Sequence, residues 1–231
     1  MTGEVGARTL EDIWPLFGLR LLTRRLELRP IRESDLVELA AVIPDDAEPD
    51  PTLPRFGLAD PSDVRAASSF QSYWGSMGSW RVDDWRVGFV ARLRAPDSSG
   101  PAGAAIGSSE LEAHGWLVRK TVETGSWLTR PARRQGLGKE LRSAMLALAF
   151  AGLGATVAET GALDDNLASV AVSRSLGYEP NGEETHDREG IPARLVKFRL
   201  SRLVWESSVR SQWPTEIEGL ERARVLFGLR P

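Results

Sequence analysis

The chain contains no cysteine and only two histidines among its 231 residues. Without cysteine there can be no disulfide, thiolate metal site or cysteine nucleophile, and the composition fits a reducing compartment. His114 and His186 lie far apart in the sequence, in segments expected to be turns. A histidine pair is therefore not expected, and we predict a protein without a metal site.

An excess of positive charge and a long apolar run are also missing. Lys and Arg number 29 against 32 Asp and Glu, which leaves no basic field to draw the chain onto nucleic acid or an anionic membrane. The longest uncharged stretch, 143–158, is shorter than the ~18–20 apolar residues that a membrane span needs. Residues 1–22 lack the features of a signal peptide. We expect a cytoplasmic protein with neither nucleic-acid nor membrane partners.

What the chain does contain is a regular succession of strand and helix patterns. Apolar residues alternate with polar ones in the expected strands, and they recur every three or four residues in the expected helices. Short turn-forming segments, 97–101 among them, connect three consecutive strands, which favours an antiparallel meander. The expected order is strand 22–30, a helix capped by Ser34 or Asp35, loop 44–61, a weak helix 61–77, strands 84–93, 104–112 and 118–129, helix 136–153, strand 155–160, a helix from Asp164 or Asp165 to 176 ended by Gly177, and strands 178–184 and 194–200.

A basic segment containing two glycines separates the strand that ends near Thr129 from the long helix. It comprises Arg133, Arg134, Gln135, Gly136, Leu137, Gly138 and Lys139. Unpaired N–H groups at a helix start, together with the helix dipole, favour anions, and glycine lets a phosphate approach the backbone. The basic side chains add charge-assisted contacts. The segment predicts a phosphate site, with an ordinary loop whose basic residues face solvent as the alternative.

Three local motifs, taken with the order of the elements, resemble the GNAT acetyltransferase superfamily. Arg133-x-x-Gly136-x-Gly138 is similar to its acetyl-CoA pyrophosphate loop, although Arg134 stands where glycine is common. Residues 165–169 followed by 175–178 resemble its second signature, an asparagine and a serine that begin the helix facing the cofactor. Residues 23–35 resemble the start of the RimJ/RimL branch, whose members include N-terminal acetyltransferases of ribosomal proteins. The resemblance covers residues 20–200.

The resemblance implies an α/β (α+β) fold, with a mixed, mostly antiparallel sheet of about seven strands flanked by helices. The strands expected at 118–129 and 155–160 would splay apart and hold the acetyl-pantetheine arm of acetyl-CoA between them. The backbone of the first of these strands would pair with the pantetheine amides. The implied cofactor-binding residues are Trp127, Leu128, Thr129, the loop from Arg133 to Lys139, Asn166 and Ser169.

Direct acetyl transfer needs a neutral amine, a stabilised oxyanion and a proton for the departing thiolate, and it needs no metal. By resemblance, Glu159 is a candidate base, with a solvent-facing or salt-bridged residue as the alternative. Ser173 stands where many members carry a tyrosine. Ser169 is a candidate donor to the sulfur, and either serine is equally expected to satisfy helix backbone groups. Glu123 is a reserve candidate, more often an ion-pair partner, and one of Trp74, Trp80 and Trp85 is a candidate for lining the acceptor pocket.

The functional hypothesis is an N-acetyltransferase that acts on a primary amine, either a protein N-terminus or a small molecule. A non-catalytic acyl-CoA-binding module is the alternative from another class. Residues 1–19 are expected to form an N-terminal extension, 20–200 the acetyltransferase domain and 201–231 a helical tail. Trp205, Trp213 and Leu226 of that tail would dock on a second subunit in a homodimer or cover the acceptor cleft.

Overall fold

The computed structural model describes residues 8–47, 53, 57–95, 103–188 and 190–230, and within them nine strands form one sheet. The strand order is β7-β8-β6-β5-β4-β3-β2-β1-β9. Neighbouring strands are antiparallel except β5 and β6, which run parallel. The strands are β1 (Arg20–Leu22), β2 (Leu26–Pro30), β3 (Asp84–Leu93), β4 (Ala105–His114), β5 (Thr121–Leu128), β6 (Val157–Leu163), β7 (Glu179–Arg188), β8 (Ile191–Ser201) and β9 (Glu216–Glu218).

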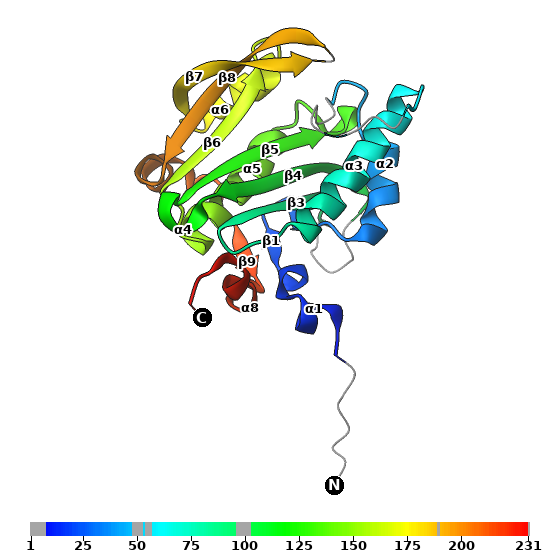
Figure 1. The fold of residues 1–231 in the computed structure, drawn as a ribbon. Helices are drawn as coiled ribbons and strands as arrows, with labels where there is room; N and C mark the ends of the chain where they lie inside the picture. The colour runs from blue at the N-terminus through cyan, green and yellow to red at the C-terminus, as the bar shows by residue number, and fades with distance from the viewer. Residues whose placement is uncertain (1–7, 48–52, 54–56, 96–102, 189, 231) are drawn as a thin grey trace.

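Helices cover both faces of this sheet, as Figure 1 shows, with α2 and α3 on the near face and α5 behind the central strands. The helices are α1 (Leu10–Ile13), α2 (Leu36–Val42), α3 (Pro61–Gly78), α4 (Trp116–Arg119), α5 (Leu137–Ala147), α6 (Leu167–Ser175), α7 (Arg202–Val204) and α8 (Leu220–Ala223). A π-helical turn, Leu148–Gly152, continues α5, so the long helix predicted at 136–153 is present. The predicted mixed, mostly antiparallel architecture is confirmed.

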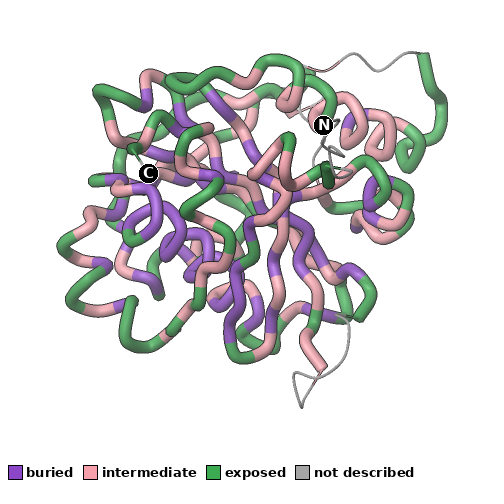
Figure 2. Tube along the Cα trace, turned by 90° about the horizontal axis from the view of Figure 1, so that it is seen from below, coloured by how far each residue is buried: buried purple, intermediate pink, exposed green. Residues whose placement is uncertain are grey.

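Most of the core lies between the sheet and α5, whose side chains from Leu141 to Ala147 are buried. Figure 2 shows the buried segments running along the central strands, with exposed residues on the surrounding turns. On the sheet side, Phe89, Leu111 and Val122 are fully or almost fully buried. Their alternation with half-exposed residues explains why the strands could be predicted, since one face of each is apolar.

The strand predicted at 22–30 is confirmed over Leu26–Pro30, as β2, but Leu22 belongs to a separate strand, β1, and the two strands form a tight hairpin. Leu22 pairs with Glu27, and the chain turns between them. The Thr23 hydroxyl accepts a hydrogen bond from the Leu26 N–H at 2.9 Å. The buried carboxylate of Glu140 accepts hydrogen bonds from the Thr23 hydroxyl and the Arg25 N–H. The turn therefore depends on a side chain from α5.

The C-terminal tail, expected to be helical, contributes a strand as well as helical turns. β9 pairs with β1 and extends the sheet at its edge. The following Gly219 has φ +73°, and a Cβ there would lie 2.0 Å from the carbonyl oxygen of Gly18. Only glycine fits such a close approach. The tail also packs against the core, because Trp205 is buried beside Phe150, with ring centroids 5.3 Å apart.

Smaller differences concern element ends. The helix predicted to start at Asp164 or Asp165 starts at Leu167, and Asn166 is its N-cap. Gly177 has φ +81° after this helix, the left-handed conformation predicted for it. The strand predicted from 118 begins at Thr121, because α4 precedes it. The predicted turn 97–101 and much of the loop 44–61 lie outside the described residues.

Candidate active site

The central feature of the site is a gap between β5 and β6. These parallel strands pair at three positions, the last being Glu123 with Glu159, and then separate. Two side-chain hydrogen bonds mark the closed end of the gap. The Thr160 hydroxyl donates to the Thr124 carbonyl oxygen at 2.8 Å, and the Thr124 hydroxyl donates to the Glu159 carbonyl oxygen at 3.3 Å. Beyond them, Gly125 and Gly161 carry no side chain.

Backbone groups of β5 face into this gap. The Thr129 N–H donates to the carbonyl oxygen of Ile106, in β4, at 2.8 Å. Because N–H directions alternate along a strand, the Ser126 and Leu128 N–H groups point the other way, into the gap. The Leu128 carbonyl oxygen also faces it and accepts from Arg133 Nε at 3.0 Å. Of the predicted backbone contacts, Leu128 thus lies on the gap side, and Ser126 is an addition that sequence reasoning missed.

The loop before α5 has the geometry of an anion site. Gly136 is the N-cap with φ +76°, and the N–H groups of Leu137, Gly138 and Lys139 form the first helical turn, where no intrahelical carbonyl is in reach. A Cβ at Gly138 would lie 3.7 Å from the side chains of Leu128 and of Val172 in α6, which is ordinary packing distance. Arg134 has φ +60°, the left-handed conformation in which glycine is preferred.

Arg133 is held by an acidic partner. Its guanidinium forms two hydrogen bonds with the Asp46 carboxylate, at 2.6 and 2.7 Å. The hydrogen bond from Arg133 lowers the pKa of Asp46, and the same pair raises the pKa of Arg133. The neighbouring Arg130 pairs with Asp45 in the same way. The acidic residues after α2 therefore neutralise part of the charge that the sequence predicted for phosphate binding.

The β1–β2 turn also holds the loop before α5 in place. Arg25 donates through Nη1 to the Gln135 carbonyl oxygen at 2.9 Å and through Nε to the Glu140 carboxylate at 2.6 Å. Gln135 donates from its side chain to the Pro131 carbonyl oxygen at 2.7 Å. These contacts set the direction of the backbone between Arg133 and the start of α5.

Helix α6 begins beside the gap. The Asn166 side-chain oxygen accepts from the Ser169 N–H at 3.1 Å, so Asn166 has a capping role. Ser169 lines the cleft. Ser173 is fully buried and its hydroxyl donates to the Ser169 carbonyl oxygen at 3.1 Å. This is the backbone-satisfying alternative considered for Ser173, and it leaves that hydroxyl facing its own helix.

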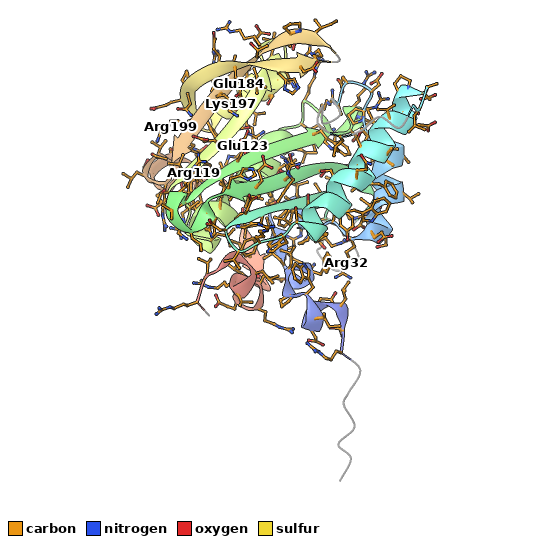
Figure 3. All side chains as sticks on the ribbon, viewed as in Figure 1. Arg32, Arg119, Glu123, Glu184, Lys197 and Arg199 are labelled. Atoms are coloured by element: carbon orange, nitrogen blue, oxygen red, sulfur yellow. The ribbon has the colours of Figure 1, made fainter. Side chains whose placement is uncertain are left out.

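The two carboxylates singled out from the sequence are engaged elsewhere. Glu159 accepts from the Asn181 side-chain amide at 3.2 Å. Glu123 on β5 accepts from Lys197 Nζ at 3.2 Å, and Lys197 also pairs with Glu184 on β7; Figure 3 shows these three side chains near one another. Burial alone would lower the pKa of Lys197, but Glu123 and Glu184 raise it. Glu123 is thus the ion-pair partner that the sequence favoured, and neither Glu123 nor Glu159 lines the cleft.

A different carboxylate, Glu110 on β4, does line the cleft. It lies opposite Gly125 across the β4–β5 ladder and opposite Gly88 across the β3–β4 ladder. A Cβ at position 125 would lie 3.1 Å from Glu110 Oε1, so the missing side chain gives this carboxylate its place beside the gap. Sequence reasoning missed it. The available signal was the alternation of Ser108, Glu110 and Glu112 on the polar face of a strand.

The cleft around the gap is wide, at about 1870 Å³. Its lining runs from α2 and α3 on one side of the sheet to the starts of α5 and α6. Its tryptophans are Trp127 and the tail residue Trp213. Trp80 and Trp85 instead stack on each other in an aromatic cluster, with centroids 6.1 Å apart. Neither of them, nor Trp74, borders the cleft, so that expectation was wrong.

The described part of the chain lacks two kinds of feature. No helix in it is both long and apolar enough to cross a membrane. Nor does it bring together three or more histidine, cysteine, aspartate or glutamate residues in a group that could hold a metal ion.

Comparison with known proteins gives a family match. Residues 25–179 match the model of the acetyltransferase (GNAT) domain family, which is more than half of the chain. This range contains the β5–β6 gap, the loop before α5 and α6.

Solved structures share the fold at low sequence identity. A candidate ribosomal-protein-serine acetyltransferase from Vibrio cholerae is 20% identical, with a TM-score of 0.58 over 79% of this chain and 97% of its own. Mycobacterium smegmatis RimJ in complex with CoA-disulfide is 17% identical, with a TM-score of 0.62 over 83% and 93%. A spermidine N-acetyltransferase, a chimera of Vibrio cholerae SpeG and hSSAT, is 12% identical, with a TM-score of 0.54 over 78% and 98%.

Proposed function

The chain belongs to the GNAT acetyltransferase family and is an N-acetyltransferase, and from this premise we propose that it transfers acetyl from acetyl-CoA to the N-terminal amine of a peptide or protein. The observation that carries the proposal is the position of Glu110 beside an open gap with a helix start at its far end. The fold shared with RimJ and with the candidate ribosomal-protein-serine acetyltransferase supports the choice of acceptor.

The acetyl-CoA site in this proposal has two parts. The pyrophosphate binds the N–H groups of residues 137–139, and Lys139 and Arg134 add positive charge. The pantetheine arm lies in the gap, where the gap-facing backbone of Ser126 and Leu128 offers hydrogen bonds along a free strand edge. The residues present fit such a ligand because glycine occupies position 136 and the strands separate after Glu123.

Glu110 is the general base in this proposal. The acceptor ammonium loses a proton to the carboxylate, and the neutral amine attacks the thioester carbon to give a tetrahedral oxyanion. Collapse of this intermediate breaks the C–S bond, the thiolate leaves, and the nitrogen loses its second proton to solvent. A gap-facing N–H of β5 stabilises the oxyanion. Glu110 lies at the level where the strands separate, whereas Glu159 lies on the closed side and is bound to Asn181. This favours Glu110 over the base suggested by the sequence.

The charges of the cleft favour a single amine over a polyamine. A polyamine carries several cations and needs several available carboxylates. Three of the four aspartates that line the cleft are paired with arginines: Asp45 with Arg130, Asp46 with Arg133 and Asp165 with Arg188. The fourth, Asp187, accepts from the Gly190 N–H. This pairing leaves little negative charge to bind a second and third ammonium group, which favours an acceptor with one amine, such as a peptide N-terminus.

The test measures thiol release from acetyl-CoA with peptides that begin with Ala, Ser or Met, and with spermidine and simple monoamines. We expect acceptor-dependent release with at least one peptide. Glu110→Gln should lower kcat/KM by about 10²–10⁴-fold without weakening acetyl-CoA binding, because only the proton acceptor is lost.

Glu112→Gln is the matched control, since Glu112 lies on the same strand and face and accepts from Arg86 Nε at 2.5 Å, but it does not line the cleft. Its kcat/KM should stay within a few-fold of the wild type. Faster turnover with spermidine than with every peptide would refute the proposed acceptor. Equal losses in the two variants would refute the role of Glu110.

A further inference from the structure

Arg142, on the face of α5 that packs against the sheet, is a buried cation that pairs with no carboxylate of the described residues. It is only 3% exposed. Its Nη1 donates to the Thr160 hydroxyl at 3.1 Å and its Nη2 donates to the Ser126 hydroxyl at 3.3 Å. Its Nε has no hydrogen-bond partner among the described residues. A buried, uncompensated charge is costly, so its presence needs a reason.

The position of this guanidinium, between the two strands of the gap, gives that reason. Ser126 is on β5 and Thr160 is on β6, so Arg142 spans the gap just beyond the last paired residues. It also lines the cleft. Each hydroxyl accepts from Arg142, and Thr160 donates onward to Thr124, so neither side chain supplies the missing negative charge. The cation lies beside the gap and keeps donor capacity for an anion.

The transfer reaction itself produces an anion in this gap. When the C–S bond breaks, its electron pair stays on sulfur, and the thiolate must be stabilised until it takes up a proton. The hydroxyl of Ser173, at the position where the family commonly has a tyrosine, faces its own helix. Arg142 carries a permanent positive charge and donates hydrogen bonds to side chains of both strands that border the gap.

We propose that Arg142 is a catalytic residue whose guanidinium hydrogen-bonds and stabilises the thiolate of CoA as it leaves the thioester. The inference rests on the proposed placement of acetyl-CoA between β5 and β6. Arg142 transfers no proton, since an arginine stays charged at any working pH, and the thiolate later takes its proton from solvent or from the protonated base. The role is electrostatic.

The chain allows a direct measurement of this effect. Because it contains no cysteine, any thiolate absorbance in its complex with CoA comes from the ligand. Tyr178 interacts with the guanidinium, and burial raises the pKa of Tyr178 and that of the other tyrosine, Tyr73. The tyrosines should therefore contribute no phenolate absorbance to a titration between pH 5 and 9.

The experiment titrates the complex of the protein with free CoA and follows thiolate absorbance in the wild type, Arg142→Met and Arg142→Lys. A cation within hydrogen-bond reach should lower the pKa of the bound thiol by about 1–3 units. Arg142→Met should abolish the shift, and Arg142→Lys should keep part of it. The kcat of the methionine variant should fall by about 10²–10³-fold, as for the loss of a donor to a transition-state anion.

Binding of CoA and of desulfo-CoA, measured by calorimetry, separates this inference from the proposed function. If the wild type binds neither, the proposed function fails. If it binds both and the thiol pKa is unshifted, only the role of Arg142 fails, and this result does not depend on any variant folding. If Arg142→Met weakens the binding of CoA and of desulfo-CoA equally and leaves the thiol pKa of bound CoA unchanged, Arg142 has only a structural role. If Arg142→Met abolishes turnover of succinyl-CoA but not of acetyl-CoA, Arg142 binds the carboxylate of an acyl group instead.

Discussion

Replacing Glu140 with glutamine should destabilise the protein and weaken acetyl-CoA binding through one set of contacts. The carboxylate is 2% exposed and accepts three hydrogen bonds, from the Thr23 hydroxyl at 2.7 Å, the Arg25 N–H at 2.8 Å and Arg25 Nε at 2.6 Å. Oε1 accepts the first two and Oε2 the third. A glutamine can keep Oε1 as an acceptor, but its amide N–H₂ then faces the Arg25 donor.

The magnitude follows from these contacts. A hydrogen bond to a charged group contributes ~1.5–3 kcal/mol, and the bonds that survive lose their charge assistance. Arg25 is 39% exposed, so water can solvate its guanidinium once the carboxylate is gone, which limits the loss. We expect Glu140→Gln to cost about 2–3 kcal/mol of unfolding free energy. For a chain of this size that lowers Tm by about 4–12 °C.

The functional consequence comes from Arg25, which also holds the Gln135 carbonyl oxygen. In the Glu140→Gln variant Arg25 loses its charged partner and orders the loop less well, so the KM for acetyl-CoA should rise several-fold while kcat changes little. Thermal unfolding and steady-state kinetics measure the two effects. Glu27→Gln is the control, because Glu27 pairs with Arg20 at the surface and should cost less than about 1 kcal/mol. A Glu140→Gln variant that melts within a degree of the wild type would refute this reasoning.

Other substitutions test separate parts of the account. Arg134→Gly relieves a left-handed backbone and should raise the unfolding free energy by about 0.5–1 kcal/mol in a denaturant titration, net of the entropy that glycine adds to the unfolded chain; a lower value would contradict this. Gly107→Ala places a Cβ 2.3 Å from a β5 carbonyl oxygen and should cost about 1–3 kcal/mol, whereas Gly75→Ala, with nothing within 4 Å, should be neutral or stabilising. Asp46→Asn releases Arg133 and should tighten CoA binding about 1.5–5-fold by calorimetry, and weaker binding would show that Asp46 positions this arginine. Arg133 lowers the pKa of Asp46, so the pair is intact above the usual aspartate range and is lost only as pH falls through the lowered value; wild-type binding should therefore show no pH dependence from this pair between pH 5 and 8.

Local patterns in the sequence were enough to predict the strands of the meander and the long helix. Each of these strands buries one face, and α5 with the π-helical turn that continues it buries Leu141, Met145 and Leu148 at helical spacing. The basic loop with Gly136 could be located for the same reason, since a helix start and a glycine are adjacent in sequence. These features depend on residues close together along the chain.

Features that depend on distant residues could not be predicted. The β1–β2 turn is held by Glu140, more than a hundred residues away. The three residues of β9 have no strand pattern of their own and are ordered by pairing with β1. Glu110 becomes prominent only where Gly125 and the separation of β5 from β6 open the sheet beside it. The sequence indicated Glu159 as a candidate base, but it could not show that this carboxylate lies on the closed side of the gap.

Amide hydrogen exchange with and without acetyl-CoA tests the central claim most directly, because it locates the ligand without a substitution. The account predicts slower exchange in two segments, residues 124–128 on the gap edge of β5 and residues 136–139 at the start of α5, with the outer strands β7 and β9 unchanged. Protection confined to other segments, with neither of these two affected, would contradict it.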